Sequence, residues 1–276
     1  HDGVLQINTG SLTGILNQAV VTTSGNNLGT VTMVSGSQTI TGNIGSNGHA
    51  IKTLNIGGAN SDGLDTSGNV YSTTTANGDI YAQNTYLNNN VTTNSSSLIM
   101  ASGYNLNSTV TTNDANMGIL TLAGGTQNVT GQVGTDTFRL AQVNSGAGAL
   151  PGTPNANSTF ESNVFAVTLN NTGTGTTNLN GNFTGTTLNF AQDGVVNLAN
   201  NKTITASVTS AVDNTSTLTV AENGTMVGDI GTTHSLKLVN IGDATNTANA
   251  STVTTDSITA TTTAINNNSA LVVRAS

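Results

Sequence analysis

The feature of this sequence that most constrains its fold is internal repetition. Residues 28–45 align with residues 117–134 over eighteen consecutive positions without a gap, and a more divergent third copy runs through residues 218–242. The copies begin near residues 4, 98 and 196, so the repeat is about 95 residues long. Self-similarity at a fixed period is typical of solenoids, in which each unit packs on the next along one axis.

Each copy contains short bursts in which apolar and polar residues alternate. These bursts lie at residues 4–7, 31–34, 54–56, 119–122, 188–190, 218–220 and 271–273. Period-two alternation between clusters of Gly, Asn, Ser and Thr predicts short strands joined by turns. No segment keeps the spacing of an amphipathic helix.

The composition favours an all-β chain that can bury a core. Thr and Asn are abundant, and both are poor helix-interior residues because their side chains compete for backbone hydrogen bonds. Disordered chains combine low hydrophobicity with high net charge and abundant Pro. This chain is 35% apolar, carries a net charge of −8 and has 2 prolines, so disorder is disfavoured.

We therefore predict an all-β fold, a right-handed parallel β-helix (β-solenoid) that forms one elongated rod over residues 1–276. Turns of roughly 20 to 25 residues would enclose Val, Ile, Leu and Met, expose ladders of Thr, Asn and Ser, and place Gly and Asn at the corners. The internal copies are expected at residues 4–97, 98–195 and 196–270, with a further copy starting at 271–276, and residues 144–156 as an irregular loop. A pair of β-sandwiches is the structural alternative, but it does not explain agreement over eighteen positions.

The predicted core comes from the apolar bursts. The side chains expected to face inward are Val31, Met33, Leu54, Ile56, Ile119, Leu122, Val133, Leu188, Phe190, Leu218, Val220, Leu238 and Ile241.

Three short strings, at residues 53–57, 129–134 and 187–191, resemble passenger domains of bacterial autotransporters. The likeness is closest to rickettsial surface cell antigens of the outer membrane protein B type. It covers most of the chain, in the style of the Thr/Asn/Gly-rich sequence more than in a diagnostic signature, and the rod is short for such a passenger. The resemblance implies a β-solenoid exported to the outside of the cell, where it acts in adhesion or as a surface layer.

The expected function is that of a non-enzymatic bacterial cell-surface structural or adhesion protein, an autotransporter passenger or surface-layer segment on the outer cell surface. Host-cell proteins or neighbouring surface proteins are the expected partners, together with head-to-tail self-association. One alternative is a subunit of an extracellular filament that stacks end to end, since residues 4–7 and 271–273 are predicted open strands. The other is a polysaccharide-acting β-helix enzyme or phage tailspike domain, although the chain has no Trp and only 4 Tyr for the aromatic platforms of carbohydrate sites.

The ionisable residues predict no catalytic, cofactor-binding or metal site. His49 and His234 occupy equivalent places in two copies, and Phe138 fills that place in the remaining copy, so we interpret it as a packing or corner position. Asp62 and Asp65 are the acidic pair three residues apart, and an Asx-turn loop at a corner is the favoured interpretation. A carboxylate pair for glycan cleavage and a Ca²⁺ site are the functional alternatives, but the stretch lacks the EF-hand and nonapeptide calcium patterns.

The basic residues are few and widely spaced in the sequence, which argues against nucleic-acid binding. They are Lys52, Arg139, Lys202, Lys237 and Arg274. No apolar run is long enough to span a membrane, and no cysteine is present for a disulfide or a thiolate metal site. The Gly-rich loop at 144–156, which holds both prolines, is the predicted partner-contacting surface because binding concentrates on loops of rigid scaffolds.

Overall fold

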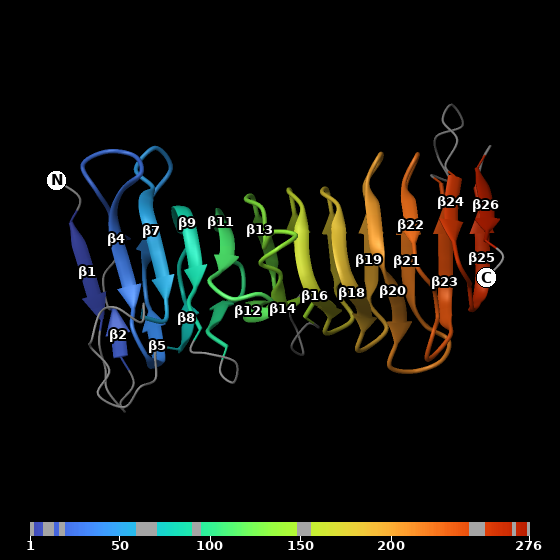
Figure 1. Ribbon diagram of the computed structural model, residues 1–276, viewed down its shortest axis with the longest axis horizontal. Coiled ribbons are helices and arrows are strands. Elements are labelled where there is room, and N and C mark those ends of the chain that lie inside the picture. The colour runs from blue at the N-terminus through green and yellow to red at the C-terminus, as the bar shows by residue number, and fades with distance from the viewer. Residues whose placement is uncertain are drawn as a thin grey trace.

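The computed structural model describes residues 3–7, 14–16, 20–58, 71–89, 95–147, 156–242, 252–266 and 269–274. Over these residues the chain is all-β, without a helix, and all of its paired strands are parallel. The strands stack along one axis in turns of about 23 residues, with the two termini at opposite ends of the rod (Figure 1). The predicted β-solenoid is confirmed, and the described strands lack the antiparallel pairing of a β-sandwich.

Two long stacks of strands and one terminal pair make up the rod. The longer stack follows the order β1 (Val4–Ile7), β4 (Leu28–Met33), β7 (Ile51–Ile56), β9 (Ile80–Leu87), β11 (Leu106–Thr112), β13 (Thr126–Val129), β15 (Asn157–Phe160), β17 (Thr176–Leu179), β19 (Val195–Leu198), β21 (Thr215–Val220), β23 (Leu236–Ile241) and β25 (Ala260–Ile265), with β3 (Val20–Val21) and β6 (Asn43–Ile44) beside it. The second stack follows the order β2 (Gly14–Leu16), β5 (Gly36–Ile40), β8 (Ser72–Ala76), β10 (Ser97–Met100), β12 (Met117–Leu122), β14 (Leu140–Ser145), β16 (Val164–Asn171), β18 (Phe183–Phe190), β20 (Thr203–Ser210) and β22 (Thr225–Val227). The terminal pair is β24 (Thr252–Thr255) with β26 (Ala270–Val273).

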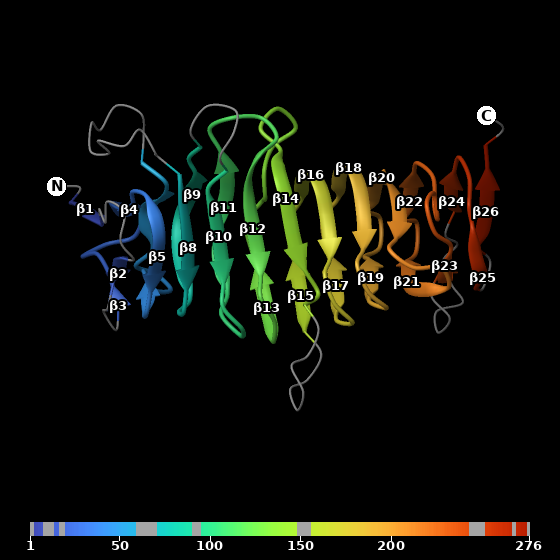
Figure 2. The same cartoon turned by 90° about the horizontal axis from the view of Figure 1, so that it is seen from below.

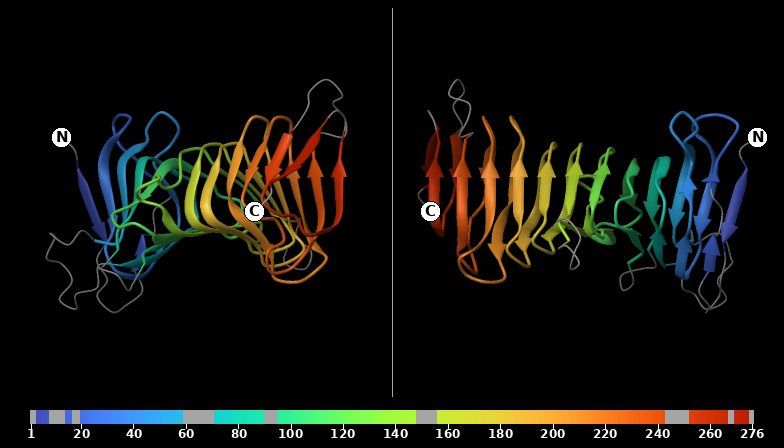
Figure 3. Two further views of the ribbon diagram at one scale, coloured as in Figure 1. Left: turned by 45° about the vertical axis from the view of Figure 1, so that its right-hand side comes forward. Right: turned by 180° about the vertical axis from the view of Figure 1, so that it is seen from behind.

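The turn that begins at β4 shows that the rod has three faces. In chain order β4 lies on the first face, β5 on the second and β6 on the third. β4 pairs with β7, which pairs with the C-terminal part of β9, whereas β6 pairs with Ile80 at the start of β9. β9 therefore bends around a corner and serves the third and first faces. The second stack is seen in Figure 2, and Figure 3 shows the rod from two further sides.

The length of a turn varies along the rod because the corners differ in size. Asn128 of β13 pairs with Thr159 of β15, so one of the longer turns lies between these two residues. The next turn is much shorter, because Thr159 pairs in its turn with Asn178 of β17. Strand pairing fixes the faces, so insertions are absorbed at the corners.

Strand alternation decides which side chains enter the core. Eleven of the thirteen predicted inward-facing residues are buried. The prediction was wrong for Ile119 and Leu238, which lie half-buried on the outer surface, while their neighbours Leu120 and Val239 are fully buried. Successive side chains of a strand point to opposite faces, so residues 119 and 122, three apart, cannot both point inward. The same parity separates residues 238 and 241.

Equivalent strands of the three copies lie on three different faces. β4, β12 and β21 are each preceded by an Asn with positive φ, at Asn27 (58°), Asn116 (61°) and Asn214 (59°), so the local fold of the copies agrees. However, β4 is on the first face, β12 is on the second face with β5, and β21 is on the third face with β13. Each copy is thus displaced by one face, because the repeat does not contain a whole number of turns.

Candidate functional site

The outer surface of all three faces carries ladders of Asn and Thr. In each copy the Asn side-chain Nδ2 donates to a Thr Oγ1 one turn earlier. The bonds are Asn55 to Thr32 (3.1 Å) on the first face, Asn144 to Thr121 (3.0 Å) on the second and Asn240 to Thr219 (3.4 Å) on the third. The same sequence motif therefore builds the same bond in three directions around the rod.

The ladders continue where further turns place Asn in the same row. On the second face, Asn170 Nδ2 donates to Asn144 Oδ1 (3.2 Å) and Asn189 Nδ2 donates to Asn170 Oδ1 (3.1 Å). On the third face, Asn197 Nδ2 donates to Asn178 Oδ1 (3.0 Å). Neighbouring strands lie about 4.8 Å apart, which is a spacing that side-chain amides can bridge directly.

A groove runs beside the ladder of the third face, over the ends of β15, β17, β19 and β21. We call it the face-three groove. It is an open groove with a volume of about 320 Å³, and it is lined by Thr159, Asn178, Asn180, Asn197, Leu198, Ala199, Thr219 and Ala221. The polar side chains of this lining are neutral amides and hydroxyls.

The groove is hollow because two small side chains occupy its row. Ala199 directly follows β19 and Ala221 directly follows β21. At the equivalent position after β17, one turn earlier, the chain has the longer side chain of Asn180. The backbone N–H of Asn180 donates to Phe160 O, that of Ala199 to Leu179 O and that of Ala221 to Leu198 O, so the three residues are in register. At one end Asn180 Nδ2 donates to Glu161 Oε2 at 2.7 Å. This site was not predicted from the sequence, although its signal is visible as Asn-Leu-Ala at 197–199 and Thr-Val-Ala at 219–221.

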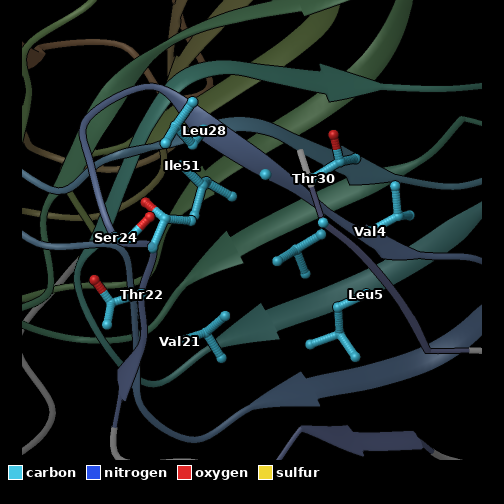
Figure 4. A pocket seen from close by; sticks show the side chains of 12 residues that line it. Val4, Leu5, Val21, Thr22, Ser24, Leu28, Thr30 and Ile51 are labelled. Atoms are coloured by element: carbon cyan, nitrogen blue, oxygen red, sulfur yellow. The ribbon is translucent and has the colours of Figure 1, made fainter. Parts of the chain in front are cut away.

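A second cavity of about 330 Å³ opens at the N-terminal end of the rod (Figure 4). Val4 and Leu5 of β1, Val21 of β3, Leu28 of β4 and Ile51 of β7 supply its apolar lining. Thr22, Ser24 and Thr30 add hydroxyl groups. These groups offer no titratable side chain for acid–base chemistry.

The position shared by His49, Phe138 and His234 is a corner, as predicted. Ser46 and His49 exchange two backbone hydrogen bonds across a tight turn, and Thr135 N donates to Phe138 O in the corresponding turn. His49 is exposed and Phe138 is 41% exposed. Since this corner position is occupied by His in two copies and by Phe in the third, it does not depend on an imidazole group.

His234 lies near an aspartate and a serine, but their hydrogen bonds do not form a catalytic relay. Asp213 Oδ1 accepts from the backbone N–H (2.7 Å) and the hydroxyl (3.1 Å) of Ser235. These two bonds lower the pKa of Asp213, and His234 adds a smaller electrostatic effect in the same direction. His234 Nδ1 contacts Ser210 O at 3.0 Å instead. In a nucleophilic triad the histidine would bond the serine and be oriented by the aspartate.

Two predicted regions fall wholly or partly outside the described residues. Asp62 and Asp65 lie outside them, so the corner-loop interpretation stays a prediction. Of the loop predicted at 144–156, Asn144 and Ser145 belong to β14 and Ala156 is buried, while 148–155 lie outside the description.

The described charged residues are dispersed along the rod, and three ion pairs are found among them. Ion pairs join Arg139 to Asp136 (2.6 Å), Lys237 to Asp193 (3.4 Å) and Arg274 to Asp256 (3.4 Å). Within the described ranges no cluster of three His, Asp or Glu side chains is arranged for a metal ion. The same part of the chain contains no helix that is long and apolar enough to cross a membrane.

Comparisons with known proteins gave no match: no family model, curated protein or solved structure is significantly similar to this chain.

Proposed function

We propose that the chain belongs to a non-enzymatic bacterial cell-surface protein, an autotransporter passenger or surface-layer segment, with a structural and adhesive role. The observation that carries the proposal is the presence of hydrogen-bonded Asn and Thr ladders on all three faces. These ladders join neighbouring turns from outside, as at Asn144–Thr121 and Asn197–Asn178. The resemblance to autotransporter passengers points in the same direction.

A rod of this construction suits a role in which the protein must hold its shape outside the cell. Parallel pairing satisfies the backbone groups between turns, and the ladders add side-chain bonds on the surface. The outer groups of the ladders are uncharged, so salt or pH changes have little effect on them. The stiff faces can then present a constant surface to host-cell proteins or to neighbouring surface proteins.

The test is to localise the protein in the bacterium that encodes it and to measure adhesion separately. Antibodies raised against the purified chain are expected to label intact cells, and added protease is expected to remove that label. Beads coated with the chain are expected to bind host cells or the bacterial surface. Label found only after lysis would contradict the surface location, and depolymerisation of a polysaccharide at enzyme-like rates would favour the enzymatic alternative.

A further inference from the structure

We infer that the face-three groove is a binding site for a neutral oligosaccharide. This inference rests on the proposed adhesive function, because it names the class of ligand that the surface would hold. The groove follows the rod axis over four consecutive strands, β15, β17, β19 and β21. Three strand spacings give a length of about 14 Å, which accommodates a short sugar chain lying along the axis.

The wall of the groove has the hydrogen-bonding groups that sugar hydroxyls need. Asn178 donates one N–H to Thr159 Oγ1 (3.4 Å), and Asn197 donates one N–H to Asn178 Oδ1 (3.0 Å). A side-chain amide has two N–H donors and two acceptor lone pairs, so each Asn keeps donor and acceptor capacity beyond the ladder. The Thr219 hydroxyl accepts from Asn240 (3.4 Å) and retains its own hydrogen.

The floor of the groove complements the apolar side of a sugar ring. Ala199 and Ala221 are half-buried and lie between the amide row and the following corner. A pyranose ring has C–H groups on one face and hydroxyls at its edge. The combination of an alanine floor and an amide wall matches both parts without an aromatic platform.

Charge and strand pairing favour this ligand class over the other candidates. The chain carries a net charge of −8, and the carboxylate of Glu161 bonds to Asn180 at one end of the groove, so an anionic polysaccharide or a nucleic acid would be repelled. A peptide that adds as a strand needs an unpaired sheet edge, whereas β17 and β19 pair on both sides. The groove is formed by side chains on strands and on the residues directly after them, whose backbone N–H groups bond to the preceding turn, and it is therefore preorganised.

The experiment uses the purified chain and a panel of neutral glucan, mannan and galactan oligosaccharides, with polygalacturonate as the anionic probe. Side-chain amide signals of Asn178 and Asn197 are followed by NMR during titration to millimolar sugar. We expect at least one neutral probe to shift these signals and polygalacturonate to leave them unchanged. Ala199→Leu fills the groove and is expected to weaken the apparent Kd by about tenfold or more.

Ala101→Leu is the matched control. Ala101 is the copy-two counterpart of Ala199, but it directly follows β10 and so lies on the second face. It should bind the sugar as the unmodified chain does. The inference is overturned if no neutral probe shifts the Asn178 and Asn197 signals, or if Ala199→Leu and Ala101→Leu bind equally. If surface labelling and bead adhesion persist in Ala199→Leu, the proposed function stands while the groove assignment fails. If the protein binds sugar but is absent from the cell surface, the groove assignment stands while the proposed function fails.

Discussion

At the scale of single residues, the three copies keep a glycine where one turn passes close to the next. Gly45, Gly134 and Gly231 occupy equivalent positions and have φ values of 68°, 68° and 74°. A Cβ on these residues would collide with the backbone carbonyl oxygen of Tyr81, Phe165 or Thr259, respectively. Both the left-handed backbone and the close approach therefore require glycine there.

Gly134→Ala is expected to destabilise the protein strongly. Its control is Gly48→Ala, because Gly48 has a φ of 79° but no neighbouring atom within 4 Å of an added Cβ. The control carries the left-handed strain alone, about 1 kcal/mol, while Gly134→Ala adds the collision and should cost about 3 kcal/mol or more. Urea unfolding of the two variants measures the difference in their free energies of unfolding. If both variants lose the same free energy of unfolding, the neighbouring turn moves away from the added Cβ at no cost.

The aspartate at the corner before β21 should titrate below its ordinary range. Ser235 donates two hydrogen bonds to Asp213, which lowers the pKa of Asp213 from its ordinary value of 3.8. A lowered folded-state pKa means that the carboxylate stabilises the fold fully above the unfolded value and that this contribution disappears as pH falls through the folded value. NMR titration of Asp213 should show the shift. Ser235→Ala should reverse it only in part, because the backbone N–H remains, and an unchanged pKa in this variant would rule out the hydroxyl contribution.

At the scale of one strand, β12 tests the rule that decides which residues form the core. Leu120 is fully buried, and Ile119 beside it lies half-buried on the outside. Since a buried unpaired charge is costly and a surface charge is not, Leu120→Asp should unfold the neighbouring turns. Ile119→Asp should change the stability by less than about 1 kcal/mol. Circular dichroism and urea unfolding of the pair decide the orientation, which would be reversed if Ile119→Asp were the more damaging change.

The sequence shows that alternate side chains of a strand point to opposite faces, but it does not show which alternate set points into the core. In Gly118-Ile119-Leu120-Thr121-Leu122 three apolar side chains occupy both parities, so alternation alone allows either face to be inside. Contacts with the strands above and below settle the phase, because Leu120 pairs with Leu98 of β10 and with Val143 of β14, both buried. Each partner lies a whole turn away along the chain, beyond the reach of a local pattern.

At the scale of the whole molecule, stability is expected to be graded along the rod. Each turn contacts only its neighbours, so a solenoid opens from its less protected parts. Phe183 and Phe190 in the middle are fully buried, whereas Val4, Val272 and Val273 are 65%, 45% and 52% exposed. Amide hydrogen exchange should be slowest in β16, β18 and β20 and fastest in β1, β25 and β26. Uniform protection along the chain would indicate a single cooperative unit instead.

The sequence by itself determined the local rules of this protein: an all-β chain, turns of solenoid length, glycines at the tight corners, and a packing or corner position for His49 and His234. These follow from alternation and backbone sterics, which act between near neighbours. The tertiary structure alone decided which face each copy occupies and which side chains meet across turns. Turns differ in length along the rod, so the repeat shifts by one face per copy. Ala199 and Ala221 come together beside the row of Asn178 and Asn197 only when the third face is assembled. The length of each corner follows from which strands pair, and the paired residues lie a whole turn apart, so no short-range periodicity in the chain reveals it.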